Sequence, residues 1–312
     1  MPTTWLSRRR TGEPLEGRLA VCTAVYPGVE AYLPEWYSSL VSQTDRNFDL
    51  WVGTDGLTPE EVGQASGQTW EANWVASPAG ATPAEVRQGV LEQVVDQYPA
   101  VVLVDSDDVL EPERVEAARL GLASADVYGS AMRVFDQRSK DLKVLFDAPG
   151  DIHDGMLARV NVYGFSNTAY RAHVMKECMP FPRDAVLLDW YVATRSWMLG
   201  ATFFFDSMPR MRYRQHDANT ARILPPFTKE QIAVGTQRVL HHYDLVLSRS
   251  AESPALHRGE LEEAQSRALR FEAATASVDV LEHYIDALDR LPPGQPWWSW
   301  VAHPDLEYIW NN

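Results

Sequence analysis

Short apolar runs alternate with amphipathic helical patterns over the first 125 residues of the chain. The runs that predict strands cover residues 19–25, 49–54, 73–76 and 100–104. The helical patterns begin near residues 29, 58 and 82, and the last two begin at Thr-Pro pairs that are typical of helix starts. Strands that alternate with helices predict a parallel sheet with right-handed crossovers, which binds its ligands at the carboxyl ends of the strands. We therefore expect an α/β fold.

The pattern changes after residue 126. We expect strands at 127–135, 142–146, 201–205 and 211–213, with a polar turn at 164–167 and a helix at 186–199. Beyond Pro226 the pattern is almost entirely helical as far as residue 291. A tail rich in tryptophan follows, and a buried core plug is the simplest role for it. The expected parts are a mobile N-terminal segment (1–18), an α/β domain (19–226) and a helical C-terminal extension (227–312).

Charge and composition narrow the classes of partner and the compartment. The formal net charge is −15 and the pI is near 4.9, which argues against a nucleic acid or an anionic membrane as the main partner. No apolar run approaches the roughly 18 residues of a membrane span. The first 18 residues do not resemble a signal peptide, and the two cysteines do not suggest a disulfide framework. We expect a cytoplasmic protein.

Three acidic residues follow the apolar run at 100–104. Asp105, Asp107 and Asp108 repel one another when ionised, and a divalent cation with oxygen ligands relieves that repulsion. Alternate side chains share one face of a strand, so Asp105 and Asp107 are expected to point the same way. A second interpretation stays open from these residues alone, in which Asp107 and Asp108 begin a turn before an acid-capped helix.

Several segments, in the same order along the chain, resemble the GT-A glycosyltransferases of family 2. The segments are the Asp105-Ser106-Asp107-Asp108 cluster (the DXD motif), 21–26 with 33–44 (the opening strand and the "SLxxQT" helix), 48–56, Gly80 with Arg87 and Gly89, Leu188-Asp189-Trp190 (the "ED" motif), and Tyr213-Arg214-Gln215-His216 with Asn219 (the "YRxH…N" segment). The similarity covers roughly residues 19 to 222, and its combined order is more specific than any one piece. One departure is Leu188, where the family usually has Glu, and it leaves the acceptor contacts open.

The resemblance implies a GT-A fold and a metal-dependent, inverting transfer of a sugar from a nucleotide sugar to an acceptor hydroxyl. The implied nucleotide-sugar contacts are Ala24, Val25, Tyr26, Asp55, Arg87, Asp105 and Ser106. The implied ligands of Mn²⁺ or Mg²⁺ are Asp107 and His216, and the implied general base is Asp189. The implied acceptor or sugar contacts are Gly164, Phe165, Ser166, Asn167 and Trp190. The partners are then a nucleotide-sugar donor and a carbohydrate or other hydroxyl acceptor, with the C-terminal helices packing on the catalytic domain or forming a homodimer.

Simpler structural roles remain open for several of these residues. The alternative for Asp55 is a role in its Asp-Gly turn. The alternative for Asp189 is a helix-start acid, and that for His216 is a surface histidine beside Asp217. The loop with His153 and Asp154 is either a lid or a connector.

Two alternative functions also remain. A nucleotidyltransferase is expected to carry a basic, glycine-rich loop after the first strand, and residues 26–30 lack that basic character. A degenerate scaffold that only binds is disfavoured because Asp107, Asp189 and His216 are all retained.

Overall fold

A computed structural model of the chain describes residues 15–148, 155–216, 219–250 and 256–311. Most of the expected N-terminal segment, the His153 and Asp154 loop and Asp217 lie outside the described residues. The chain forms two compact units. The first takes in Met1–Leu145, Tyr163–Asp184 and Ala201–His216, and the second Phe146–Val162, Ala185–Gly200 and Asp217–Asn312. The expected boundary at residue 226 stays a prediction.

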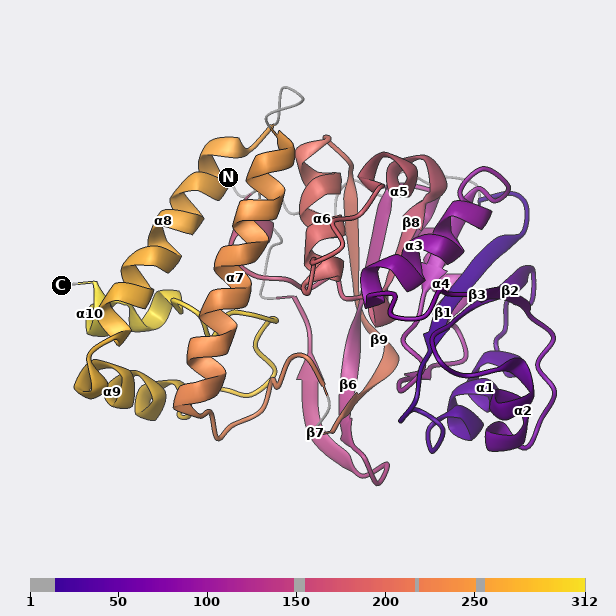
Figure 1. Ribbon diagram of the computed structural model, residues 1–312, viewed down its shortest axis with the longest axis horizontal. Coiled ribbons are helices and arrows are strands. Elements are labelled where there is room, and N and C mark those ends of the chain that lie inside the picture. Colours follow the sequence, from indigo (N-terminus) through magenta and orange to yellow (C-terminus); the bar gives the residue numbers. More distant parts are fainter. Residues whose placement is uncertain (1–14, 149–154, 217–218, 251–255, 312) are drawn as a thin grey trace. The chain divides into compact units, whose positions relative to one another are not determined.

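The first unit is built on a mixed sheet (Figure 1). Its strands are β1 (Leu19–Val25), β2 (Phe48–Thr54), β3 (Asn73–Ala76), β4 (Ala100–Leu103), β5 (Val109–Leu110), β6 (Val127–Asp136), β7 (Asp141–Phe146), β8 (Thr168–Arg171) and β9 (Phe203–Gln215). The order is β3-β2-β1-β4-β8-β6-β9-β5, with β7 paired to β6. The first four of these strands run parallel, whereas β8 is antiparallel to both β4 and β6. The expected α/β architecture is confirmed.

Helices surround this sheet and are defined by strong local signals. They are α1 (Leu33–Val41), α2 (Pro59–Ser66), α3 (Pro83–Val94), α4 (Arg114–Leu122) and α5 (Ala172–Cys178). Thr58 and Thr82 each form a capping box with the glutamate three residues later, which satisfies backbone N–H groups at the starts of α2 and α3. Helix α3 approaches β2 closely at Gly53, where a Cβ atom would lie 2.8 Å from a methyl group of Val90. Gly53 thus lets α3 pack against the sheet.

The sheet differs from the expected pattern in three places. The two runs expected at 201–205 and 211–213 form one strand, β9, whose register against β6 shifts near Ala131. Strand β5 has two residues, and the short β8 and α5 follow the polar turn without a periodic signal. These elements are too short for hydrophobic periodicity to identify them, and their pairing partners are distant in the sequence.

The second unit is helical. It contains α6 (Leu188–Met198), α7 (Lys229–Ser250), α8 (Arg258–Thr275), α9 (Val278–Leu288), α10 (Glu307–Trp310) and short 3₁₀ turns at Met156–Ala158 and Pro304–Leu306. The tail tryptophans are each at most 5 % exposed, so their expected role as a core plug is confirmed. Trp297 packs on Phe146 with ring centroids 4.1 Å apart, and Trp310 meets Phe271 edge-on. Large aromatic side chains thus hold the C-terminal helices together.

No helix in the described residues is long and apolar enough to cross a membrane.

Candidate functional site

The carboxyl ends of β1, β2 and β4 meet at one edge of the sheet. The amide of Asp55 donates to the carbonyl oxygen of Val25 at 3.0 Å, and the Ser106 hydroxyl donates to the carbonyl oxygen of Ala24 at 2.7 Å. Gly56 has φ +77°, so the expected Asp-Gly turn forms after β2. The structure therefore brings together Ala24, Val25, Asp55 and Ser106, which the resemblance assigned to the nucleotide.

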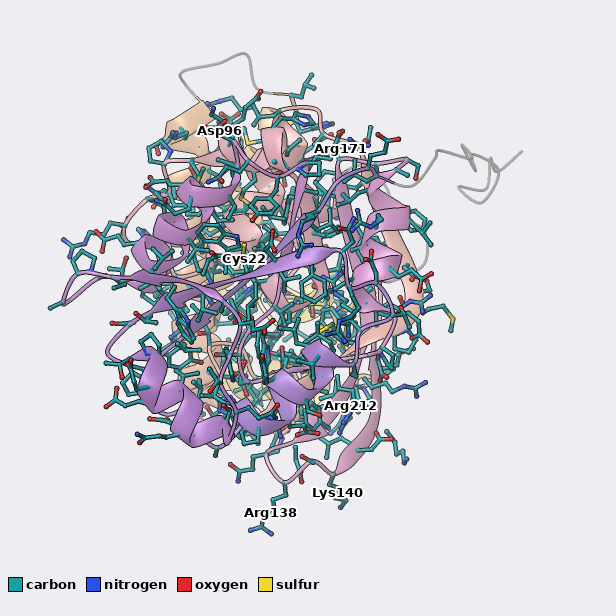
Figure 2. All side chains as sticks on the ribbon, turned by 90° about the vertical axis from the view of Figure 1, so that its right-hand side faces the viewer. Cys22, Asp96, Arg138, Lys140, Arg171 and Arg212 are labelled. Atoms are coloured by element: carbon teal, nitrogen blue, oxygen red, sulfur yellow. The ribbon has the colours of Figure 1, made fainter. Side chains whose placement is uncertain are left out.

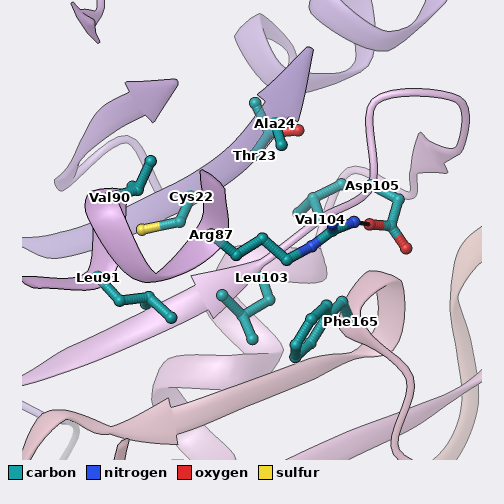
Figure 3. A pocket seen from close by; sticks show the side chains of 10 residues that line it. All are labelled: Cys22, Thr23, Ala24, Arg87, Val90, Leu91, Leu103, Val104, Asp105 and Phe165. Carbon is teal, nitrogen blue, oxygen red and sulfur yellow. Dashed lines mark hydrogen bonds and ion pairs between the residues drawn. The ribbon is translucent and has the colours of Figure 1, made fainter. Parts of the chain in front are cut away.

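A shallow pocket lies at this edge and is closed on one side by an ion pair (Figure 3). Arg87 reaches from α3 to the carboxylate of Asp105, with Nη2 and Oδ1 2.7 Å apart. The guanidinium also lies over the Phe165 ring, 5.2 Å from its centroid. Cys22, Thr23 and Ala24 of β1 also line the pocket. The pocket therefore places one cation and one carboxylate beside apolar surface, which suits a ligand with charged and flat parts.

The three acids after β4 have separate surroundings. Asp108 is 1 % exposed, accepts the amide of Arg214 at 2.7 Å and accepts the Ser166 hydroxyl. Burial, together with the negative charges of Asp107 and Asp105, holds the pKa of the Asp108 carboxyl well above its usual range. Burial also raises the pKa of Asp105; Arg87 opposes this rise and Asp107 adds to it. A bound cation would stabilise the ionised carboxylates and so lower the pKa values of Asp105 and Asp108.

Asp107 pairs with His216. The imidazole Nε2 lies 2.9 Å from the Asp107 carboxylate Oδ2, and the two side chains are about one tenth exposed. His216 is also stacked on Tyr32, with ring centroids 5.4 Å apart. The surface-histidine interpretation is therefore wrong, because β9 carries His216 to the end of β4.

The Asp107–His216 pair offers a carboxylate oxygen and an imidazole nitrogen, both of which bind divalent ions. The two atoms lie at hydrogen-bond distance, 2.9 Å, so a bound ion would replace that hydrogen bond. The described residues contain no group of three or more His, Cys, Asp or Glu side chains that would form a complete metal cage. Two protein ligands leave positions for water and phosphate oxygens, which is how Mg²⁺ is commonly held.

The polar turn at 164–167 lies against the acids. Its 3₁₀ turn, Phe165–Asn167, is buried, and the Ser166 hydroxyl accepts the amide of Asp105 at 3.2 Å. The side-chain amide of Asn167 donates to the carbonyl oxygen of Ser130 at 2.6 Å, and Thr168 donates to Gly164. Ser166 therefore contacts the site directly, whereas Asn167 and Gly164 have structural bonds. Their role in acceptor binding stays a prediction.

Asp189 and Trp190 lie in the second unit, at the start of α6. One carboxylate oxygen of Asp189 accepts the amide of Trp190 at 2.7 Å, as a helix-start acid does. The Trp190 indole is buried, donates to the carbonyl oxygen of Leu157 at 2.8 Å and stacks on His242 with centroids 4.1 Å apart. Trp190 therefore has a packing role, and a role in acceptor binding stays a prediction.

His242 gives a prediction about acid stability. Burial, with a contribution from His241, lowers its pKa to about 3, and neither ring nitrogen has a hydrogen-bond partner among the described residues. An unfolded histidine binds its proton near pH 6.5, so the folded state loses stability as the pH falls from about 6.5 towards 3, by about 1.4 kcal/mol per pH unit. His242→Phe should remove this slope in denaturant unfolding. The exposed His283→Gln should leave it intact, and an unchanged slope in His242→Phe would disprove the assignment.

Sequence reasoning missed the residues that support the Asp107–His216 pair. They are Tyr32, Glu35 and Arg214, which contact one another or the pair. Glu35 and Arg214 are 179 positions apart in the sequence, so no local pattern links them. The only available signal was the position of Arg214 inside the segment that resembles "YRxH".

Comparisons with known proteins give a fold. No family model matches the chain, and no curated protein matches it. Among solved structures, S. aureus TarS 1-349 is similar with a TM-score of 0.58 and 16 % identity, over 87 % of this chain and 78 % of that one. TarS 1-349 in complex with UDP-GlcNAc gives a TM-score of 0.52 and 17 % identity, over 87 % and 88 %. A longer S. aureus TarS structure gives 0.57 and 16 %, over 81 % of this chain and 43 % of that one. The likeness confirms the expected GT-A fold with C-terminal helices.

Proposed function

We propose that this protein is a metal-dependent, inverting glycosyltransferase that moves a sugar from a nucleotide-sugar donor to an acceptor hydroxyl. The observation that carries the proposal is the Asp107–His216 pair, 2.9 Å apart at the carboxyl edge of the parallel strands. Open α/β sheets bind ligands at this edge. The neighbour solved with UDP-GlcNAc has the same fold, which supports a uridine diphosphate sugar as the first donor to test.

The proposed donor site uses the first unit's residues in separate roles. The nucleobase would be contacted by Ala24, Val25, Tyr26 and Asp55. Arg87 and Asp105 would contact the ribose and phosphates, where the guanidinium supplies a fork suited to phosphate oxygens. Asp107 and His216 would hold Mn²⁺ or Mg²⁺. When bound, the ion would stabilise the negative charge that develops on the leaving diphosphate.

The proposed acceptor chemistry requires a base. Asp189 would accept the proton of the attacking hydroxyl, the role that a carboxylate within hydrogen-bond reach of that hydroxyl can fill. One of its carboxylate oxygens accepts the Trp190 amide, which fixes the side chain at the start of α6. Ser166, beside the acids of the first unit, is the proposed sugar contact with the clearest supporting bond.

The nucleotidyltransferase alternative is not favoured. In the loop after β1, the amide of Gly28 donates to the carboxylate of Glu30 at 2.6 Å. A negative charge therefore lies where that class would need a basic, phosphate-binding loop.

Compartment and assembly are also proposals. The thiols of Cys22 and Cys178 are buried, which supports a reducing cytoplasm. A homodimer through the C-terminal helices is proposed in addition, and light scattering of the purified protein measures it directly.

Equilibrium binding tests the proposed function. Calorimetric titration with UDP-GlcNAc in the presence of Mn²⁺ should show one site, and UDP should compete for it. Donors with other nucleobases would be titrated in parallel, because the residues that line the pocket do not select one nucleobase. Absence of binding for every nucleoside diphosphate sugar would remove the donor from the proposal.

A further inference from the structure

Arg214 belongs to the "YRxH"-like segment, and the proposed reaction gives it no role. Its side chain is 2 % exposed. The guanidinium Nε donates to the carbonyl oxygen of Asp107 at 2.6 Å, and Nη2 donates to the Glu35 carboxylate at 2.7 Å. Burial raises the pKa of Glu35, but hydrogen bonds from Arg214 and Ser139 outweigh it and lower the pKa overall. Glu35 is therefore the ionised partner that a buried guanidinium requires.

The flat faces of the guanidinium contact two aromatic rings. Its Cζ atom lies 4.5 Å from the centroid of Tyr32 and 4.3 Å from that of Phe135. Tyr32 also stacks on His216, and the His216 imidazole pairs with the Asp107 carboxylate. The contacts form a closed circuit that runs from the Asp107 carbonyl through Arg214, Tyr32 and His216 back to the Asp107 carboxylate. Displacing one member therefore displaces the others.

We propose that Arg214 is a positioning residue that sets the geometry of the Asp107–His216 pair through the Asp107 main chain and the Tyr32 ring. This role rests on the proposed function, in which Asp107 and His216 hold the metal ion that binds the diphosphate of the donor. Arginine is required because lysine has neither an Nε donor nor a planar face, so it cannot bond the Asp107 carbonyl and stack on Tyr32 at once.

Arg212 provides a matched control. It lies two positions earlier on β9 (Figure 2), pairs with Glu35 at 3.1 Å and lies 4.5 Å from the Phe135 centroid. It thus shares two partners with Arg214. Among the described residues, Arg212 forms no hydrogen bond, ion pair or ring contact with Asp107 or Tyr32. Arg212→Lys therefore makes the same chemical change on the same strand without altering the closed circuit.

The first readout needs neither metal nor donor. The imidazole signals of metal-free protein labelled with ¹³C-histidine are recorded by NMR, and His216 is assigned by the signal lost in His216→Gln. Arg214→Lys and Tyr32→Leu should both shift or broaden the His216 signal, because the Tyr32 ring moves or disappears. Arg212→Lys should leave it in place. Loss of the Tyr32 ring changes the His216 signal whatever Arg214 does, so Glu35→Gln decides the question if Arg214→Lys does not fold. Glu35 is partly exposed and its carboxylate pairs with Arg214. An unmoved His216 signal in folded Glu35→Gln would overturn the proposal.

The second readout is Mn²⁺ binding with UDP, measured from the free Mn²⁺ signal by electron paramagnetic resonance. Arg214→Lys should weaken it roughly 10- to 100-fold, the usual effect of losing a group that orients a metal ligand. Arg212→Lys should bind as the parent does. A His216 signal that is the same in Arg214→Lys as in the parent would overturn the positioning role, even in an active enzyme. If the signal moves but the parent transfers no sugar, the proposed function fails and the positioning role stands.

Discussion

Asp189→Asn is expected to lower turnover by roughly 10²- to 10⁴-fold, because it removes the proposed proton acceptor. Asparagine has nearly the same shape and its side-chain oxygen can still accept the Trp190 amide, so α6 should begin as before. Donor and metal binding should persist, since their proposed ligands are Asp55, Asp105 and Asp107. The measurement is steady-state turnover with a working acceptor, alongside calorimetric binding of UDP.

The exposed Asp184 offers a control for this substitution. Asp184→Asn removes a carboxylate from the loop that precedes α6 and should retain parental turnover. If Asp189→Asn turns over at nearly the parental rate, Asp189 is only a helix-start residue. The base would then have to be Asp151 or Asp154, or Asp184 if Asp184→Asn itself loses turnover.

Asp107→Ala should abolish the metal dependence of nucleotide binding. The side chain supplies one of the two proposed ligands, so Mn²⁺-supported UDP affinity should fall by roughly 10- to 100-fold or more. In the parent, a chelator should produce a comparable loss. Calorimetry with and without chelator measures both.

An acid remote from this pair gives the comparison for Asp107→Ala. Asp96 follows α3 and pairs with Lys176 on the surface (Figure 2). Asp96→Ala should bind UDP as the parent does. A role for Asp107 in the turn alone would instead alter stability in Asp107→Ala and leave the effect of the chelator unchanged.

The sequence predicted the parts of the fold that depend on local signals. The parallel strands β1, β2 and β4 are apolar runs bounded by turn residues, and α2 and α3 begin at capping boxes. The Asp-Gly turn and the acid cluster were located in the same way. These features were predictable because each is encoded within a few neighbouring residues.

Long-range features were not predictable. The bulged pairing of β9 with β6 brings His216 to Asp107, 109 positions earlier, and hydrophobic periodicity carries no information about such pairing. Arg214 reads as a charged residue near the end of a strand, yet the fold buries it between Tyr32 and Phe135. Asp107 was a candidate metal ligand from the acid cluster itself, whereas His216 was proposed as a ligand only because the order of several motifs resembles a known family.

The most direct test of the account is a donor screen. Purified protein would be incubated with UDP-, GDP-, ADP- and CMP-linked sugars, with Mn²⁺ or Mg²⁺ and with or without carbohydrate acceptors, while nucleotide release and transfer of a labelled sugar are measured. A metal-dependent, inverting glycosyltransferase should release nucleotide from at least one donor only when metal is present, lose that release in Asp107→Ala, and give a product with inverted anomeric configuration. No release and no transfer from any donor under any condition would contradict the proposed function.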